Sequence, residues 1–86
     1  MEFQFDPAKS AGNEAKHGLD FVQAQELWND AMRVEVPART MDEPRWLVIG
    51  RVGVQHWSAV VTYRGERTRI ISVRRSRPEE VAIHES

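Results

Sequence analysis

The feature that most constrains the fold is a series of three strand-like apolar segments in the second half of the chain. They cover residues 45–52, 56–64 and 67–75, and Gly53 and Gly65 lie in the short connections. Glycine readily adopts the left-handed backbone of tight turns, and strands joined by such short turns run antiparallel. The sequence therefore predicts a three-stranded antiparallel meander at the centre of the fold.

The start of the chain predicts a short strand followed by a helix. Polar and aromatic residues alternate over 2–5, which is typical of a strand. Asp6 is a good N-cap and Pro7 suits the first helical position, where its missing N–H has no partner to lose. The helix should run to about His17 and end at Gly18, a residue suited to the left-handed cap.

Two further elements are predicted before the meander. Apolar residues recur over 21–28 at the spacing of one helix face. Residues 31–36 alternate in polarity as a half-buried strand does, and Pro37 ends them. The loop over 38–44 is polar.

A final short helix is expected after Pro78, where Glu79 and Glu80 fall in its first turn. The predicted order is thus β-α-α-β-β-β-α, which is an α+β fold with two helices on one face of a mostly antiparallel sheet. The other face of the sheet should be open. No repeat or linker divides the chain, so we expect residues 1–86 to form a single domain.

Composition excludes several kinds of protein. The 86 residues contain no cysteine, which removes disulfides, thiolate metal sites and cysteine nucleophiles and is compatible with a cytoplasmic location. The N-terminus lacks the pattern of a signal peptide, and no apolar run is long enough to span a membrane. We therefore expect a cytoplasmic protein.

The charges are unevenly distributed along the chain. Residues 1–43 carry a net charge of −5 and residues 44–86 a net charge of +4, and every cation in the second half is arginine. The planar guanidinium group matches phosphate or carboxylate oxygens bidentately, so this choice favours recognition of an anion with a defined shape. The alternative is a solvated set of surface charges.

Several fragments, in this order and spacing, carry a family resemblance. They are Phe5-Asp6-Pro7-Ala8-Lys9, Asn13, Lys16-His17-Gly18, Phe21, Glu43-x-Arg45-Trp46, Ile49-Gly50, Tyr63-Arg64-Gly65 and Arg69-Ile-Ile-Ser-Val-Arg74. Together they resemble the BrnT-type toxins of BrnT/BrnA toxin–antitoxin modules, small ribonucleases related in fold to the RelE toxins. The resemblance covers nearly the whole chain. The chain departs from the family pattern at Ser10, where asparagine is usual, at Val73, where alanine is usual, and in its C-terminal ending.

The resemblance implies a metal-independent endoribonuclease that cleaves RNA and inhibits translation and growth, with no cofactor. It also implies a BrnA-like ribbon-helix-helix antitoxin, which forms a heterotetramer with the toxin and binds promoter DNA. The alternative is a non-catalytic module of RelE-like fold that binds an antitoxin or a nucleic acid. Because one sheet face is expected to be exposed, we also expect the free chain to form homodimers when its partner is absent.

Arg64 and Arg74 are the leading candidates to stabilise charge on a phosphate during cleavage. A loop with an odd number of residues between the last two strands would place Arg64 on the same face as Thr68, Ser72 and Arg74, and we predict such a loop. The two guanidinium groups should then converge on the uncovered face. The alternative is that each arginine is a charge at a sheet edge.

Three further residues are candidates for acid–base or phosphate roles. His17 is a candidate acid or base, because histidine is a common proton donor and acceptor in catalysis, and Lys16 is a candidate phosphate contact. The alternative is that both complement the helix dipole at the end of the first helix. Glu43 is a candidate base, but a loop carboxylate beside Arg45 is also a plausible ion pair.

Predicted RNA contacts come from arginines and one aromatic residue: Arg45, Arg69, Arg75 and Trp46. Trp46 is a candidate to stack on a base, with core packing as the alternative. No metal site is predicted, because the three histidines, His17, His56 and His84, are far apart in the sequence and lack neighbours at ligand spacing.

Overall fold

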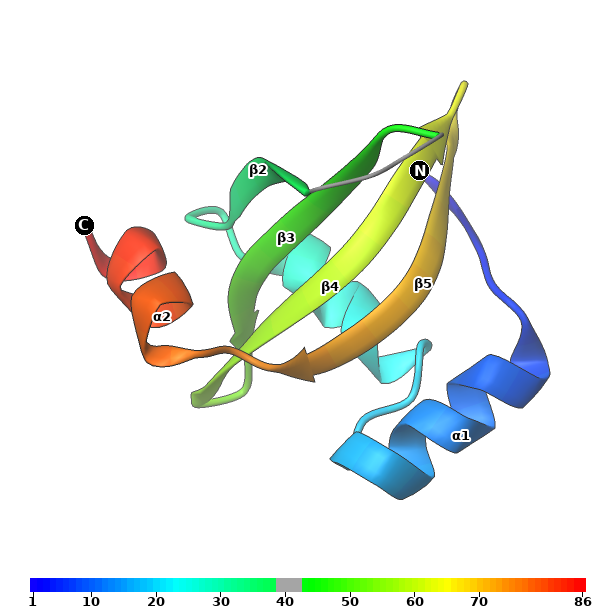
Figure 1. Ribbon diagram of the computed structural model, residues 1–86, viewed down its shortest axis with the longest axis horizontal. Coiled ribbons are helices and arrows are strands. Elements are labelled where there is room, and N and C mark those ends of the chain that lie inside the picture. The colour runs from blue at the N-terminus through cyan, green and yellow to red at the C-terminus, as the bar shows by residue number, and fades with distance from the viewer. Residues whose placement is uncertain (39–42) are drawn as a thin grey trace.

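A computed structural model of the chain describes residues 1–38 and 43–86. Its elements are β1 (Glu2–Gln4), α1 (Pro7–His17), η1 (Gln23–Asn29), β2 (Val34–Ala38), β3 (Arg45–Val52), β4 (Gln55–Arg64), β5 (Arg67–Arg75) and α2 (Pro78–Glu85) (Figure 1). The predicted α+β class and the central meander are confirmed. The predicted order β-α-α-β-β-β-α is wrong in its number of strands, because it contains four and the described residues form five. Most of the predicted loop over 38–44, including Asp42, lies outside the described residues.

The five described strands form one sheet in the order β1-β5-β4-β3-β2. β1 is parallel to β5, whereas the other neighbours are antiparallel. Arg64 pairs with Arg67, so only Gly65 and Glu66 connect β4 to β5. Gly65 has a φ of 61°, as the first residue of a type II′ hairpin loop requires. The prediction of an odd-numbered loop is therefore wrong.

A β-bulge in β5 changes the sheet face toward which the side chains in the second half of the strand point. Val61 pairs with Ile70 but Val60 pairs with Ser72, so β5 carries one extra residue at this point. Paired residues point to the same face, and the extra residue reverses the alternation beyond it. Ser72 and Arg74 consequently share a face with Arg64, as predicted. The predicted position of Thr68 on this face is wrong, because Thr68 pairs with Tyr63 on the other one.

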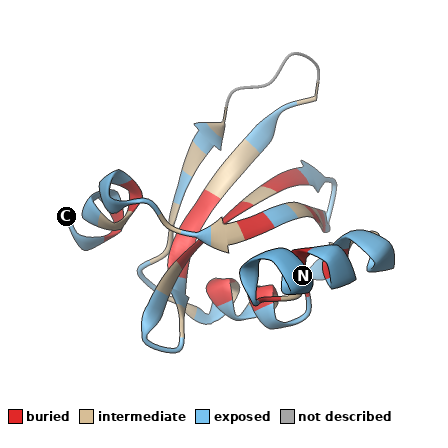
Figure 2. Cartoon of the chain, turned by 60° about the horizontal axis from the view of Figure 1, so that its bottom comes forward, coloured by how far each residue is buried: buried red, intermediate tan, exposed pale blue. Residues whose placement is uncertain are grey.

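The core lies between one face of the sheet and the segment that contains η1. Its fully buried members on the sheet include Val48, Ala59, Val61, Ile70 and Val73. Figure 2 shows buried positions along β3, β4 and β5, with consecutive buried residues in β3 and β4, while most of α1 is exposed. We call this the core face, and the opposite side of the sheet the open face.

The second predicted helix is a 3₁₀ helix and not an α-helix. Phe21, Ala24 and Leu27 are spaced three residues apart and are all buried in the core. This spacing aligns with three residues per turn, so the tighter helix directs Ala24 and Leu27 to one side, and Phe21 precedes them in the turn before the helix. η1 also packs closely on β3, because a Cβ atom at Gly50 would lie 3.2 Å from Leu27 Cδ2.

Two buried polar side chains fix α1 beside the edge of β5. Asn13 Oδ1 accepts from Val73 N at 3.1 Å, and Asn13 Nδ2 donates to Leu19 O at 2.7 Å. Ser10 Oγ accepts from Phe21 N at 2.9 Å. β1 pairs only with the first residues of β5. Beyond the end of β1, Asn13 provides a hydrogen-bond acceptor for a backbone N–H group at the free edge of β5.

The open face is not fully open, which corrects the prediction. α2 lies at the end of the sheet remote from the β4–β5 turn (Figure 1) and packs against β3. Glu80 and His84 of α2 are buried. The rest of the open face is not covered by a described helix, and it ends at the β4–β5 turn.

Candidate functional site

Four arginines share the end of the open face next to the β4–β5 turn. Arg64 and Arg67 pair with each other, and Arg69 pairs with Thr62, two residues from Arg64 on β4. Arg45 on β3 points to the same face as Leu47, because the two are two residues apart in the strand, and Leu47 pairs with Val60 on the open face. We call the residues Arg45, Arg64, Arg67 and Arg69 the arginine cluster. The structure thus brings together three of the predicted site residues, and Arg67 was missed.

Glu43 adds a carboxylate to the arginine cluster. Arg64 Nε and Nη2 both donate to Glu43, each at 3.1 Å, in a bidentate arrangement. The side chains of Arg64 and Glu43 are 52% and 41% exposed, so a ligand can reach the pair from solvent. Glu2 lies 3.9 Å from Arg67. Glu66 lies in the turn between Arg64 and Arg67. In the described part of the chain no carboxylate pairs with Arg45 or Arg69, so the four arginines outnumber the three glutamates here by one.

A buried hydroxyl lies beneath the arginine cluster. Thr62 is completely buried on the open face between Arg64 and the paired Arg69. Its Oγ1 atom has no hydrogen-bond partner among residues 1–38 and 43–86.

Arg74 lies at the opposite end of the open face, which makes the predicted convergence with Arg64 wrong. It is level with Ser58, six residues from Arg64 along β4, a separation of about 20 Å at the rise of a strand. Both Arg74 Nη atoms donate to Glu80 of α2, at 2.7 and 2.8 Å. Alternation and the bulge place the two arginines on one face of the sheet. Arg64 lies next to the β4–β5 turn, however, and Arg74 lies at the other end of that face.

Glu80 is the centre of a polar network that attaches α2 to the sheet. Besides Arg74, it accepts from Ser58 Oγ and from Arg77 N, both at 2.9 Å. The Arg74 guanidinium, the Arg77 N–H and the Ser58 hydroxyl outweigh burial and lower the pKa of Glu80 to about 2. The same partnership raises the pKa of Arg74.

This network predicts a loss of stability in acid. The folded-state pKa of Glu80 is below the usual value of 4.5, so its contribution is complete above that pH and is lost as the pH falls to about 2. The difference corresponds to about 3 kcal/mol. Urea unfolding at pH 6 and pH 2 measures it, and Glu80→Gln should have a smaller pH dependence. An equal pH dependence in the variant would show that Glu80 does not contribute in this way.

The remaining predicted residues lie outside the arginine cluster. Lys16 and His17 are exposed at the end of α1, one turn beyond Asn13, and Asn13 contacts the far end of β5 at Val73. Trp46 points to the core face, opposite to Arg45, and its ring centroid lies 6.5 Å from that of Tyr63. The fourth predicted RNA contact, the guanidinium of Arg75, lies 5.6 Å from the ring of buried Trp57.

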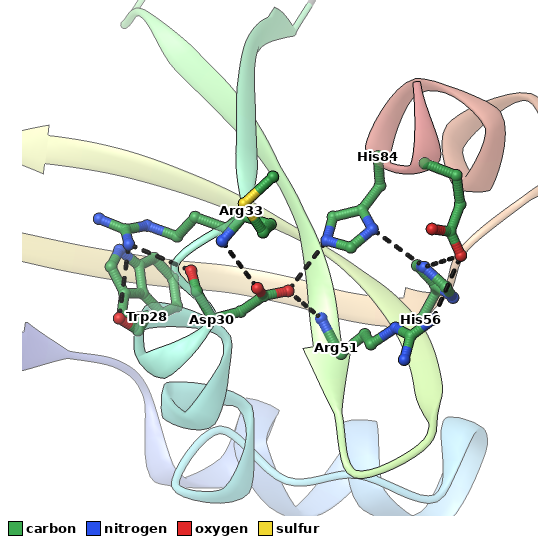
Figure 3. A network of polar contacts seen from close by, with 8 residues as sticks. Trp28, Asp30, Arg33, Arg51, His56 and His84 are labelled. Atoms are coloured by element: carbon green, nitrogen blue, oxygen red, sulfur yellow. Dashed lines mark hydrogen bonds and ion pairs between the residues drawn. The ribbon is translucent and has the colours of Figure 1, made fainter.

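The sequence prediction missed a histidine cluster at the α2 end. His84 Nε2 donates to Asp30 Oδ2 at 2.9 Å, and His84 Nδ1 lies 3.0 Å from His56 Nε2 (Figure 3). Burial alone raises the pKa of Asp30, but hydrogen bonds from the Met32 and Arg51 N–H groups and from His84 outweigh it and lower that pKa. His56 and His84 are distant in the sequence but adjacent in the fold, and the absence of a metal site stays a prediction.

The comparison with protein families decides the identity. Residues 5–80 match the family described as "Ribonuclease toxin, BrnT, of type II toxin-antitoxin system". The chain belongs to the BrnT family. The resemblance noted in the sequence is thereby confirmed, and membership implies a ribonuclease toxin with an antitoxin partner.

Two further findings complete the comparison. A search of curated proteins found no match to the chain. Among the described helices, none has both the length and the apolar character needed to cross a membrane.

Proposed function

We propose that this BrnT-family chain is a metal-independent endoribonuclease whose catalytic centre is Glu43 and Arg64, within the arginine cluster. The observation that carries the proposal is the bidentate contact of Glu43 with Arg64 on an exposed surface where guanidinium groups are in excess. A carboxylate base next to cations supplies what cleavage of a ribose-phosphate backbone needs. Cleavage of RNA by this centre inhibits translation and growth in the cytoplasm.

The proposed reaction uses the 2′-hydroxyl of the substrate as nucleophile. Glu43 takes the proton from this hydroxyl. The 2′-oxygen then forms a bond to the adjacent phosphorus, and the bond from phosphorus to the 5′-oxygen breaks. Solvent water, which reaches this exposed site, gives a proton to the leaving 5′-oxygen. Arg64 stabilises the negative charge on the phosphate, and the products carry 2′,3′-cyclic phosphate and 5′-hydroxyl ends.

The neighbouring arginines are proposed to bind the RNA on either side of the cleaved phosphate. Arg45 and Arg69 flank the buried Thr62, and neither has an ion-pair partner among the described residues. Phosphate contacts of this kind position a nucleic acid without reading its sequence. The other predicted site residues, Lys16, His17, Arg74, Arg75 and Trp46, lie outside this centre, and their roles in RNA contact or catalysis stay predictions.

We further propose a BrnA-like ribbon-helix-helix antitoxin as the partner implied by the family. In this proposal the antitoxin covers the open face, the complex is a heterotetramer, and promoter DNA binds through the antitoxin. A RelE-like relationship of the fold, and homodimers of the free chain, belong to the same proposal. Expression of a neighbouring small gene should restore growth to cells that produce this chain.

Incubation of the purified chain with end-labelled RNA in the presence of EDTA tests the activity. We expect cleavage to persist in EDTA and to yield 2′,3′-cyclic phosphate ends, because the proposed base and cations are protein side chains. A substrate with 2′-deoxyribose throughout should resist cleavage, since it lacks the nucleophile. Intact RNA under all conditions, with normal growth of producing cells, would instead support the non-catalytic binding module.

A further inference from the structure

We propose that His56, His84 and Glu85 form a zinc-binding site that fastens α2 to the sheet. The three side chains come from β4 and from the last turn of α2, and each offers one potential ligand atom. These atoms all lie within 4.8 Å of one another. Figure 3 shows the imidazole rings of His56 and His84 directed toward each other.

The spacing of the ligand atoms fits tetrahedral zinc. His56 Nε2 lies 3.0 Å from His84 Nδ1 and 3.4 Å from Glu85 Oε1. Ligand bonds of about 2.0–2.1 Å at tetrahedral angles place neighbouring ligand atoms about 3.3 Å apart. Small side-chain shifts therefore suffice to bind the ion. Glu85 is 52% exposed, so a water molecule has access to the fourth position.

Asp30 supplies the outer contact that a zinc-bound histidine usually has. Its Oδ2 atom accepts from His84 Nε2, which leaves Nδ1 of the neutral ring without a proton and directed toward His56. The Asp30 carboxylate is itself held by the Met32 and Arg51 backbone N–H groups, at 2.8 and 3.0 Å. The orientation of the His84 ring is thus fixed before a metal binds.

The ligand chemistry selects zinc over magnesium or calcium. Two imidazole nitrogens suit zinc and its transition-metal neighbours, whereas the alkaline-earth ions prefer oxygen ligands. The Arg51 guanidinium donates to Glu85 Oε1 at 3.2 Å and competes with a cation for this oxygen. A shallow cleft lined by Asp30, Met32, Arg51, His84, Glu85 and Ser86 provides a path from solvent.

The proposed zinc site is independent of the proposed nuclease centre. It joins α2 to the end of the sheet opposite the β4–β5 turn, where Arg64 lies. Zinc should therefore stabilise the fold without taking part in RNA cleavage. EDTA would remove the ion from this site and leave the cleavage reaction to the arginine cluster.

Titration of the untagged full-length chain with zinc ions, followed by calorimetry and thermal unfolding, tests the proposal. We expect one zinc ion per chain and a higher melting temperature in its presence. His56→Gln and His84→Gln should each lower the affinity at least tenfold, and Asp30→Asn should lower it about 10- to 100-fold. His17→Gln is the matched control and should bind zinc like the natural chain.

Two further measurements keep the proposal open to contradiction if a histidine variant fails to fold. Arg51→Ala removes the competing cation and should strengthen zinc binding, and X-ray absorption of the zinc complex should show N/O ligands at about 2.0–2.1 Å. The absence of stoichiometric binding to the natural chain would overturn the proposal. So would equal loss of affinity in His17→Gln, or unchanged affinity in a folded Asp30→Asn or Arg51→Ala variant.

Discussion

Replacing Glu43 by glutamine is expected to slow RNA cleavage by about 10²- to 10⁴-fold, the usual contribution of a positioned acid–base group. The amide has nearly the shape of the carboxylate and can still accept a hydrogen bond from Arg64, but it cannot take the 2′-hydroxyl proton. The geometry behind this expectation is the paired 3.1 Å contacts between the two residues. Initial rates on a short labelled RNA, with substrate in excess, measure the effect.

Glu14→Gln is the matched control for the Glu43 variant. Glu14 is exposed on α1 and lies outside the arginine cluster, so its loss should leave the cleavage rate unchanged. Circular dichroism should show that both variants keep the fold. Full activity in a folded Glu43→Gln variant would remove this residue from the mechanism and leave the arginine cluster as a binding surface.

The second large effect is expected for Arg64→Ala, which should lower the cleavage rate by about 10²- to 10³-fold. The guanidinium is proposed to stabilise charge that develops on the phosphate, and loss of one such donor has an effect of this size. Arg64→Lys should retain part of the activity, because an ammonium group keeps the charge but cannot make the bidentate contact. Single-turnover rates at saturating enzyme separate this effect from weaker RNA binding.

Arg51→Ala is the corresponding control for the arginine variants. Arg51 is also half exposed and pairs with a glutamate, but it lies at the α2 end of the sheet. We expect this variant to cleave RNA at the normal rate. Equal losses in Arg64→Ala and Arg51→Ala would indicate that general positive charge, and not the position of Arg64, supports activity.

The net charge of −1 does not conflict with RNA binding, because the distribution of charge matters more than its sum. Several described carboxylates of the acidic first half take part in caps, networks and ion pairs, among them Asp6, Asp30 and Glu43. The arginine cluster gathers cations from three neighbouring strands. A modest slope of affinity against salt concentration should accompany so few phosphate contacts.

Local patterns in the sequence sufficed to predict most of the fold. Asp6 and Gly18 do cap α1, since Asp6 Oδ1 accepts from Ala8 N and Gly18 adopts a φ of 88°. The glycines of the meander connections also have positive φ, at Gly53 and Gly65. These features depend on a few neighbouring residues, which is why the sequence reveals them.

Features that depend on distant residues were not predictable in this way. The bulge opposite Val60 and Val61 has no glycine or proline to mark it, yet it decides which way Arg74 points. The contact between His56 and His84 joins residues 28 apart, and Asp30 is 54 residues from His84. Such contacts follow from strand register and from the docking of α2, neither of which the sequence pattern specifies.

The candidate site contains some residues that the sequence pattern places together and others whose position depends on distant contacts. Arg45, Arg64 and Arg69 could be predicted as neighbours once the meander was recognised, because antiparallel strands on short turns bring these positions to one end of the sheet. The contact of Arg64 with Glu43 joins residues 21 apart, which the strand pattern alone does not specify. The position of Arg74 was misjudged because two residues on one face can lie at opposite ends of it, as Arg64 on β4 and Arg74 on β5 do.

The most direct test of the central claim maps where RNA lies on the folded chain. The isotopically labelled protein is titrated with a short 2′-O-methyl RNA, which cannot be cleaved, while backbone amide signals are followed by NMR. We predict that the largest shifts fall at Arg45, Thr62, Arg64 and Arg69, with little change at Lys16, His17 or in α2. Shifts confined to α1 or α2, with the arginine cluster unaffected, would contradict the proposed location of the catalytic centre.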